Sequence, residues 1–335
     1  MTPRTTYLPL QELVRRQVET ALNESLADTY APELREMIMG YLARPARYIR
    51  PRLVIAAARA YGATEFGTDA PVVRLAVATE LLHIFALLHD DRIDTSCRDG
   101  EFSRETALLA GDLLYTVGYG LIAETVASSQ LPREILLQVR HVASRTVVGQ
   151  AADVTFRRTH SDRPHLTDLY RLYDMKTGLY TMAAPLQIGA LAAGSPPSEI
   201  SALHAVALPL GRAFQMRDDL RDMASAQDVL QGTIPPWELN LAVTHAAERA
   251  RQGGSEPEPI GDATMFLADS DTHELARFVD DRIGELVDEA TRAVDQLSLP
   301  VDRRVDFRRE LEATLTSLTF PPEGANTEPR SYGTQ

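Results

Sequence analysis

The sequence predicts an all-α fold of about ten helices around a central cavity. Along most of the 335 residues, apolar side chains recur every three or four positions, which is the spacing of an amphipathic helix. No stretch of any length alternates between apolar and polar residues as a strand does. Because no change of composition marks a boundary, we expect one domain over residues 1–320 and a disordered tail over 321–335.

The individual helices follow from apolar spacing and from the residues that interrupt it. Pro51 is well placed as the first residue of a helix, because its fixed φ is helical and its missing N–H is not needed there. Glycine, proline and polar segments separate the later helices. The expected helices run over 8–26, 32–42, 51–60, 71–94, 104–128, 132–157, 166–193, 198–223, 237–251, 272–297 and 302–318.

Composition limits the classes of function. With 44% hydrophobic and 24% charged residues, the chain should fold around a core. A net charge of −13 argues against a nucleic-acid partner and against docking on anionic lipid. Cys97 is the one cysteine, so no intramolecular disulfide forms, which fits a reducing cytoplasm. The N-terminus lacks the apolar core of a signal peptide, and no uninterrupted apolar run approaches the roughly 18 residues of a membrane span. We therefore expect a soluble cytoplasmic protein.

Two clusters of aspartates end two of the apolar helices, and the chain is organised around them. The first cluster is Asp90, Asp91 and Asp94, and the second is Asp218, Asp219 and Asp222. Residues four apart lie on one face of a helix, so the first and last members of each cluster point the same way. If the two helices face each other, six carboxylates line one cavity. Hard oxygen ligands of this kind suit Mg²⁺, and such a cage binds and activates a diphosphate.

Basic residues suggest a second anion site before the helix that starts at Pro51. Arg44, Arg47 and Arg50 follow each other at intervals of three residues. The N-terminus of a helix offers free N–H groups and the positive end of the helix dipole, and arginine grips phosphate with two parallel hydrogen bonds. His83 lies two turns before the first aspartate cluster and can reach the same cavity, whereas His89 is expected to be a core residue.

Further polar residues occur on helices that are otherwise suited to packing. Lys176 is the only lysine in the sequence, and with Thr177 it interrupts an apolar helix. A buried lysine needs a partner, and a diphosphate would serve. Gln150 and Asp153 share one helix face, and Gln215 precedes the second cluster by three residues. Each of these positions can add a polar group to the cavity.

Together these residues resemble the trans-isoprenyl diphosphate synthases, also called the polyprenyl synthetase family. The resemblance covers about residues 33–236 and includes both aspartate clusters and the histidine at position 83. The other matching segments are Arg47-Tyr-Ile-Arg-Pro51, Leu109-Ala-Gly-Asp112, Gly149-Gln-Ala-Ala-Asp153, Lys176-Thr-Gly178 and Phe214-Gln215.

The resemblance implies a fold of the isoprenoid synthase type, a reaction and a set of roles. An allylic prenyl diphosphate would bind to three Mg²⁺ ions that the two aspartate clusters hold, and Lys176 and Arg98 would help to hold its diphosphate. Ionisation would leave an allylic cation near Thr177 and Gln215, and isopentenyl diphosphate would attack it. The remaining binding residues would be Arg47, Arg50, His83, Phe85, Gln150 and Asp153. The protein would be a homodimer through helices in the region 104–157.

The position of Phe85 predicts a specific role for this residue. It lies five residues before Asp90 and should project below the diphosphate site, where a growing prenyl chain would run. The prediction is that Phe85 limits the length of the chain that is accepted or made.

Three departures from the family pattern concern the acceptor side. Asp99 stands where the family has an arginine that grips isopentenyl diphosphate, and the family's glycine pair before Arg47 is absent. The stretch 228–235 after the second cluster carries none of the family's lysines. Three functions therefore stay open: a short- or medium-chain prenyl diphosphate synthase, a terpene cyclase or a prenyltransferase with another acceptor, and a catalytically silent partner subunit. Retention of all six aspartates argues against the silent subunit.

Overall fold

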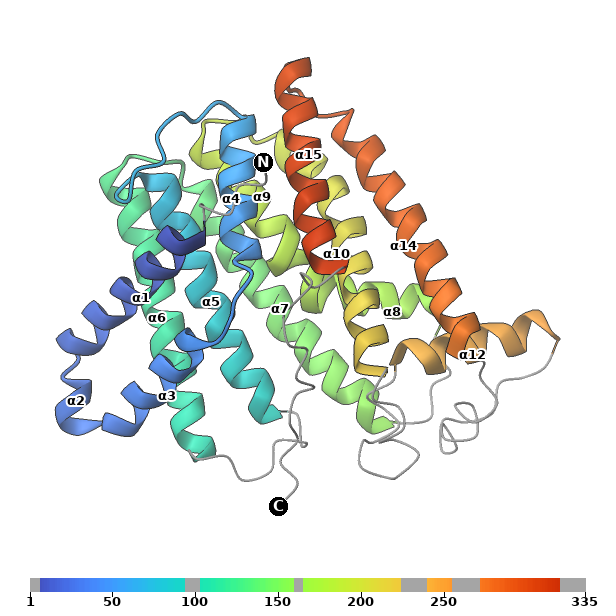
Figure 1. Ribbon diagram of the computed structural model, residues 1–335, viewed down its shortest axis with the longest axis horizontal. Coiled ribbons are helices and arrows are strands. Elements are labelled where there is room, and N and C mark those ends of the chain that lie inside the picture. Colours follow the sequence, from blue (N-terminus) through green and yellow to red (C-terminus); the bar gives the residue numbers. More distant parts are fainter. Residues whose placement is uncertain (1–6, 94–102, 160–164, 224–239, 255–271, 320–335) are drawn as a thin grey trace. The chain divides into compact units, whose positions relative to one another are not determined.

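The computed structural model describes residues 7–93, 103–159, 165–223, 240–254 and 272–319, and all regular elements in these ranges are helices (Figure 1). The all-α prediction is confirmed. The helices are α1 Tyr7–Glu24, α2 Ala27–Tyr30, α3 Pro32–Ala43, α4 Ile49–Ala60, α5 Pro71–Ile93, α6 Arg104–Ser128, α7 Glu134–Thr159, α8 Leu166–Tyr173, the π-helix η1 Asp174–Ala183, α9 Ala184–Ala192, α10 Glu199–Met223, α12 Asn240–Gln252, α14 Thr272–Val294 and α15 Val301–Thr319.

The chain forms two compact units, each built from separate stretches of sequence. The first unit contains 1–136, 188–195 and 309–335, and the second contains 137–187 and 196–308. One domain over 1–320 stays a prediction, and the tail over 321–335 lies outside the described residues.

In the first unit, α5 packs along α6 and against α4 (Figure 1). The buried face of α5 carries a near-continuous apolar surface that includes Leu75, Leu81 and Leu88. Gly118 of α6 allows the close approach, because a Cβ there would lie 3.2 Å from side-chain atoms of Leu81 and Leu82. This pairing fixes the C-terminal end of α5, which carries the first aspartate cluster.

Two helices, α5 and α6, are long and apolar enough to cross a membrane by length and composition alone. Neither run is uninterrupted, in line with the sequence: Arg74, Glu80 and His83 lie within the apolar stretch of α5. Of the apolar stretch of α5 within Pro71–Asp90, 61% is buried inside the protein. Helix α6 packs directly against α5. Both features are those of core helices in soluble proteins.

In the second unit, α10 is the central helix and packs against α14, η1, α8 and α12. Its buried face joins a core of aromatic and aliphatic side chains: Leu169, Tyr170, Tyr173, Ala213, Met216, Leu241, Leu275, Val279, Ile283 and Leu286. Pro209 lies inside α10 without ending it. This core holds the C-terminal half of α10, where the second aspartate cluster lies.

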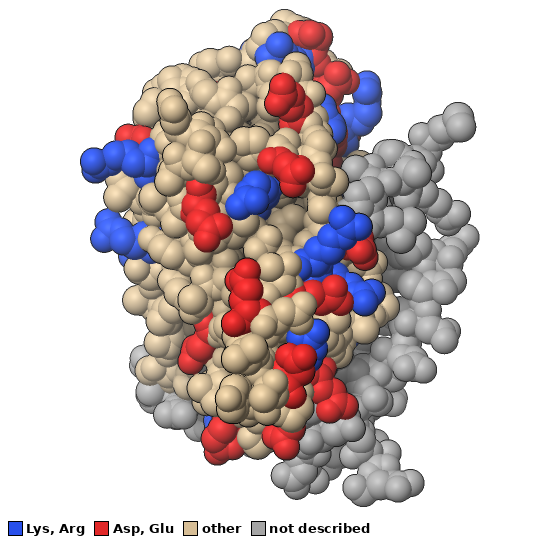
Figure 2. All heavy atoms as spheres, turned by 90° about the vertical axis from the view of Figure 1, so that its left-hand side faces the viewer, with Lys and Arg blue, Asp and Glu red and all other residues tan. Residues whose placement is uncertain are grey.

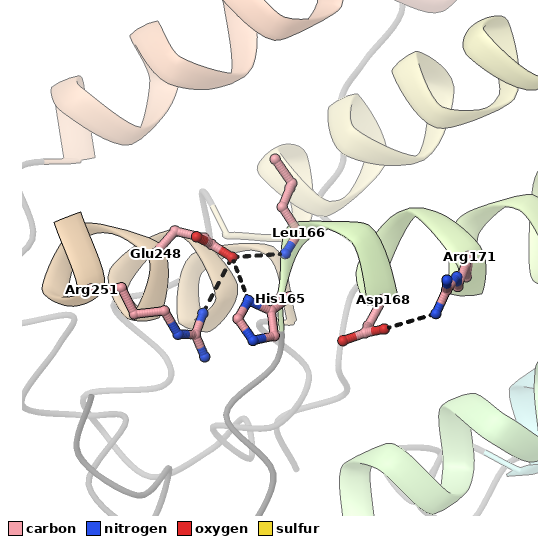
Figure 3. A network of polar contacts seen from close by, with 6 residues as sticks. All are labelled: His165, Leu166, Asp168, Arg171, Glu248 and Arg251. Carbon is pink, nitrogen blue, oxygen red and sulfur yellow. Dashed lines mark hydrogen bonds and ion pairs between the residues drawn. The ribbon is translucent and has the colours of Figure 1, made fainter. Parts of the chain in front are cut away.

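The N-terminus of α8 is tied to α12 by Glu248 (Figure 3). One oxygen of this carboxylate accepts hydrogen bonds from the Leu166 backbone N–H at 3.1 Å and from Arg251 at 3.2 Å, and lies 3.3 Å from His165 Nδ1. The first N–H groups of a helix have no partner within it, and a carboxylate also interacts favourably with the helix dipole there. Glu248 therefore fixes where α8 begins, and with it the start of the helix that leads into η1.

Charges are spread rather than gathered on the face that Figure 2 shows. Aspartate and glutamate side chains lie there among arginines, with wide uncharged areas between them (Figure 2). The apolar side chains that are exposed on helices include Leu109 and Tyr115 of α6 and Val147 and Val148 of α7.

Candidate active site

The two aspartate clusters lie in the last turns of α5 and α10, as the sequence predicts. Asp90 is half-buried near the end of α5, and Asp218 is half-buried near the end of α10. The side chains of Asp91 and Asp222, and the whole of Asp94, lie outside the described residues, and so does Arg98. Among the described side chains, no group of three carboxylates, histidines or cysteines lies close enough to hold a metal ion.

Asp219 is the centre of a hydrogen-bonded network, which we call the Asp219 network. Tyr173 donates its hydroxyl hydrogen to Asp219 Oδ2, and Gln215 Nε2 donates to Asp219 Oδ1 at 2.8 Å. The Thr177 hydroxyl in turn donates to Gln215 Oε1 at 2.6 Å. The network joins the end of α8 and the π-helix η1 to α10. It brings together three residues that the sequence analysis selected, and it adds Tyr173.

The electrostatics of the Asp219 network favour a cation beside it. Burial raises the pKa of Asp219 to about 7, and the neighbouring Asp218 charge raises it further, against the two hydrogen bonds that lower it. Burial and the Asp219 charge also raise the pKa of the Tyr173 hydroxyl well above its usual value, so this group stays a donor. A carboxylate enclosed in this way is stabilised by a positive charge, and its oxygens are hard ligands. The oxygens of Asp219 are therefore of the kind that suits Mg²⁺.

Lys176 forms an ion pair with Asp153. Lys176 Nζ lies 2.9 Å from Asp153 Oδ2, and the side chains are 22% and 3% exposed. A partner for this lysine was predicted, but the predicted partner was a diphosphate and not Asp153. Gln150 is half-buried one turn earlier on α7.

The contact between α7 and η1 depends on Gly149. A Cβ at this position would lie 2.8 Å from the Lys176 backbone nitrogen and 2.7 Å from the Met175 Cβ. A side chain at residue 149 would therefore push α7 away from the lysine. This gives a physical reason for the glycine in the segment Gly149-Gln-Ala-Ala-Asp153.

A buried polar cluster in the first unit joins α4 to α5. Arg50 lies close enough to both Glu80 and His83 for its charge to affect them, and Tyr48 lies near Glu80. Burial raises the pKa of Glu80 to about 7 although the Arg50 charge lowers it, and one Glu80 oxygen receives no hydrogen bond from the described residues. Burial and Arg50 lower the pKa of His83 well below its usual value, so this imidazole is neutral at pH 7. Glu80 is a buried polar residue that the sequence did not single out, although its place three residues before His83 inside an apolar helix was a visible signal.

The arginines at positions 44, 47 and 50 differ in exposure and in the backbone that carries them. Arg50 is buried within the first turn of α4, which begins at Ile49 rather than at Pro51, whereas Arg44 and Arg47 are exposed. Tyr48 has φ of 51°, a left-handed conformation that turns the chain between Arg47 and Arg50. Arg44 lies over the Tyr41 ring at 3.7 Å from its centroid. The regular three-residue spacing is therefore not carried by a continuous helix.

Phe85 stands against an aromatic layer on α6. Its ring centroid lies 5.2 Å from that of Tyr115 and 4.7 Å from that of His89, and Tyr115 stacks on Tyr119 at 6.2 Å. His89 is held by the Leu108 carbonyl at 3.1 Å from its Nε2, in keeping with a structural role. Gly111 makes room for this arrangement, because a Cβ there would lie 2.4 Å from the His89 ring.

Fold and site together define an all-α protein of the isoprenoid synthase type. The family model for polyprenyl synthetase matches residues 31–235, and the chain belongs to this family. A geranylfarnesyl diphosphate synthase of Natronomonas pharaonis is 34% identical over 174 residues, which cover 49% of each chain. A short chain isoprenyl diphosphate synthase of Methanothermobacter thermautotrophicus is 28% identical over 74% of this chain and 78% of its own. The chain thus spans about half the length of the first relative and about three quarters of the second.

Solved structures share the fold. A geranylgeranyl pyrophosphate synthase of Corynebacterium glutamicum, complexed with isoprenyl diphosphate and magnesium, has a TM-score of 0.69 at 22% identity over 92% of this chain and 98% of its own. A heptaprenyl diphosphate synthase of Staphylococcus aureus has a TM-score of 0.69 at 17% identity over 94% and 99% of the two chains. These likenesses confirm the predicted isoprenoid synthase-type fold.

Proposed function

We propose that the protein is a Mg²⁺-dependent prenyltransferase that ionises an allylic prenyl diphosphate and condenses it with isopentenyl diphosphate. Membership of the polyprenyl synthetase family supports this, as do relatives that are all prenyl diphosphate synthases by name. The observation that carries it is the polar face where η1 meets α10. There the only lysine of the sequence and Thr177 are consecutive in η1, and the Thr177 hydroxyl bonds to Gln215 of α10, next to the second aspartate cluster.

The residues of the chain divide into those that hold the diphosphate and those that hold the prenyl group. Asp90, Asp91, Asp94, Asp218, Asp219 and Asp222 would bind three Mg²⁺ ions. When bound, these ions stabilise the negative charge that develops on the departing diphosphate.

Lys176 and Arg98 would donate hydrogen bonds to the same diphosphate. Asp153 holds the Lys176 ammonium in place through their ion pair. Gln150 lies on the same side of α7, one turn from Asp153, and would add a further hydrogen-bond donor.

Two side chains of the Asp219 network would face the allylic cation. Thr177 uses its hydrogen on Gln215, so its oxygen lone pairs remain to face a positive charge. Gln215 is oriented by Asp219, which accepts from its NH₂ group. A cation in an apolar cavity is stabilised by fixed dipoles of this kind and protected from water.

The acceptor would be held by the basic residues of the first unit. Arg47, Arg50 and His83 would bind isopentenyl diphosphate, and Glu80 lies beside buried Arg50. After the new carbon–carbon bond forms, the adjacent carbon loses a proton, which the departing diphosphate accepts.

The comparisons do not favour a terpene cyclase or another acceptor, since the relatives condense prenyl units according to their names. Asp99, which motivated that alternative, lies outside the described residues. A purified sample offered geranyl, farnesyl and geranylgeranyl diphosphate with Mg²⁺ tests both readings. Elongated linear diphosphates that form only when isopentenyl diphosphate is present support the proposal. Hydrocarbon products without isopentenyl diphosphate would contradict it.

The aspartate clusters give the proposal a residue-specific test. Asp90→Ala and Asp218→Ala should each lower turnover at least a hundredfold, because each removes a charged ligand from a shared cage. Asp288→Ala, which replaces an exposed aspartate of α14, is the matched control and should leave turnover unchanged. Full turnover of the wild type in excess chelator would refute the requirement for a divalent ion.

Assembly and location belong to the same proposal. We propose a cytoplasmic homodimer that buries the exposed apolar side chains of α6 and α7, among them Leu109 at 59% and Val147 at 64% exposure. Light scattering at micromolar concentration should give twice the chain mass of 37.0 kDa. A single species of 37.0 kDa would refute the dimer.

A further inference from the structure

The polar face of α10 extends one turn beyond the Asp219 network, to Arg212. Residues at intervals of three and four positions share a helix face, so Arg212, Gln215 and Asp219 form one row on α10. Each member of the row bonds to a residue at the end of α8 or the start of η1. Gln215 and Asp219 belong to the proposed catalytic and metal-binding set, but Arg212 does not.

Arg212 forms a two-pronged ion pair with Asp174, the first residue of η1. Arg212 Nε and Nη2 donate to the two Asp174 oxygens at 2.8 and 2.7 Å. The side chains are only 23% and 17% exposed. Charge-assisted pairs in this fork geometry fix orientation as well as supplying energy. Asp174 stands two residues before Lys176, so whatever fixes Asp174 also sets where the lysine points.

A π-helix of ten residues, as η1 is, needs support from its surroundings. π-Helical turns are rare and occur mostly at functional sites. A return to α-helical geometry would change the angle between successive residues, about 100° in an α-helix. Lys176 and Thr177 would then rotate away from Asp153 and Gln215.

Close backbone contact alone does not fix this register. Gly211 lies against Gly178, where an added Cβ would be 2.5 Å from the Gly178 Cα. Two glycines in contact allow the helices to approach but carry no group that selects one rotation over another. The Arg212 fork on Asp174 supplies a directional contact next to this point.

We propose that Arg212 is a positioning residue: through Asp174 it holds η1 in its π-helical register, which places Lys176 on Asp153 and Thr177 on Gln215. The catalytic consequence rests on the proposed prenyltransferase function, whereas the register itself does not. Arg212 touches neither substrate nor metal in this scheme and acts through η1.

Arg282 provides a matched control. Its guanidinium lies 5.6 Å from the centroid of the Tyr170 ring, and that of Arg212 lies 5.3 Å from the same ring. Arg282 also donates to the Tyr170 hydroxyl at 2.7 Å and pairs with Glu285, and neither partner belongs to η1. Arg282→Met therefore removes an arginine from the same surroundings without touching Asp174.

Hydrogen–deuterium exchange tests the register without reference to activity. In Arg212→Met, exchange of the amides of residues 174–183 should become at least tenfold faster than in the wild type. Arg212→Lys keeps the charge but loses the fork, and Asp174→Asn loses the charge of the partner, so both should give intermediate rates. Arg282→Met should leave these amides unchanged. Equal exchange rates in Arg212→Met, Asp174→Asn and the wild type would overturn the proposal.

Kinetics then test whether the register serves catalysis. Arg212→Met should lower kcat at least tenfold and change KM for the allylic diphosphate less than threefold, whereas Arg282→Met should change neither by more than threefold. Because Arg212 would act through both Lys176 and Thr177, the same substitution should cost less than threefold in a background that carries Lys176→Met and Thr177→Val. An equal cost in this background and in the wild type would overturn the positioning role. Absence of prenyl transfer in the wild type would instead refute the proposed function and leave the exchange result standing.

Discussion

Replacing Glu80 by glutamine should remove a specific pH dependence from the stability of the protein. Glu80 is 3% exposed, and burial raises its pKa to about 7 from the ordinary value of 4.5. In the unfolded chain the carboxyl ionises near pH 4.5, but in the folded chain it keeps its proton up to about pH 7. The contribution of Glu80 to stability is therefore fully present below pH 4.5 and is lost as the pH rises to 7.

The size of the effect follows from the difference between the two pKa values. A pKa difference of one corresponds to about 1.4 kcal/mol, so the rise from 4.5 to about 7 corresponds to about 3 kcal/mol. Arg50 and Tyr48 are the groups whose charge or hydroxyl interacts with Glu80, and His83 shares Arg50 with it. The lowered pKa of His83 acts in the opposite direction, since it destabilises the folded chain as the pH falls below 6.5. The wild type and Glu80→Gln both contain His83, so the difference between their free energies of unfolding reports on Glu80 alone.

Denaturant unfolding of the wild type and of Glu80→Gln at pH 5 and pH 8, followed by far-UV circular dichroism, measures this difference. The free energy of unfolding of the wild type, relative to that of the variant, should fall by up to about 3 kcal/mol between the two pH values. Glu285→Gln, an exposed glutamate on α14, serves as the control and should show no such change.

A relative stability that stays constant between pH 5 and pH 8 would refute the reasoning. It would mean that Glu80 is ionised in the folded protein across this range, with the Arg50 charge outweighing the cost of burial. A relative stability that rises with pH would contradict it more strongly, since that sign belongs to a carboxyl group whose pKa is lowered on folding.

Three further predictions concern the prenyl chain, the helix contact and the acceptor. Phe85→Ala should lengthen the products, because it removes the ring that stands against Tyr115 below the proposed diphosphate site. An unchanged length distribution by mass spectrometry would make Phe85 a packing residue. Gly211→Ala should destabilise the fold by roughly 1–3 kcal/mol through overpacking. Gly284→Ala should not, because a Cβ at that position has no atom within 4 Å. Equal melting temperatures of the two variants would contradict this. Asp99→Arg should lower KM for isopentenyl diphosphate tenfold or more; a low micromolar wild-type KM that the substitution leaves unchanged would indicate that another residue grips the acceptor.

Most helices could be predicted from sequence because their signals are local. Apolar spacing and proline placed the ends of α3, α4, α6 and α10 within two residues of where they lie. The break between α1 and α2 was missed, since the left-handed Leu26 with φ of 56° that separates them is not a glycine. The division of the expected helix over 166–193 into α8, η1 and α9 was also missed. Contacts with another helix produce that division, and a helical pattern does not record them.

The candidate site shows the same limit. Motif spacing selected Lys176, Thr177 and Gln215, and the structure joins the last two by a hydrogen bond. It did not reveal that Asp153 pairs with Lys176 or that Arg212 pairs with Asp174, because each pair joins helices that are distant in sequence. The row of Arg212, Gln215 and Asp219 was visible in the spacing, but only the facing residues of η1 and α8 give it meaning.

The position of Lys176 also makes the chain convenient to probe with proteases. A protease that cuts only after lysine finds one cleavage site among 335 residues, and that site lies inside η1 in a packed ion pair. Cleavage there requires the segment to open, so its rate reports the opening equilibrium of this one helix. Each event leaves two fragments of nearly equal size. A gel then shows whether a bound ligand keeps this helix closed, without any label on the protein.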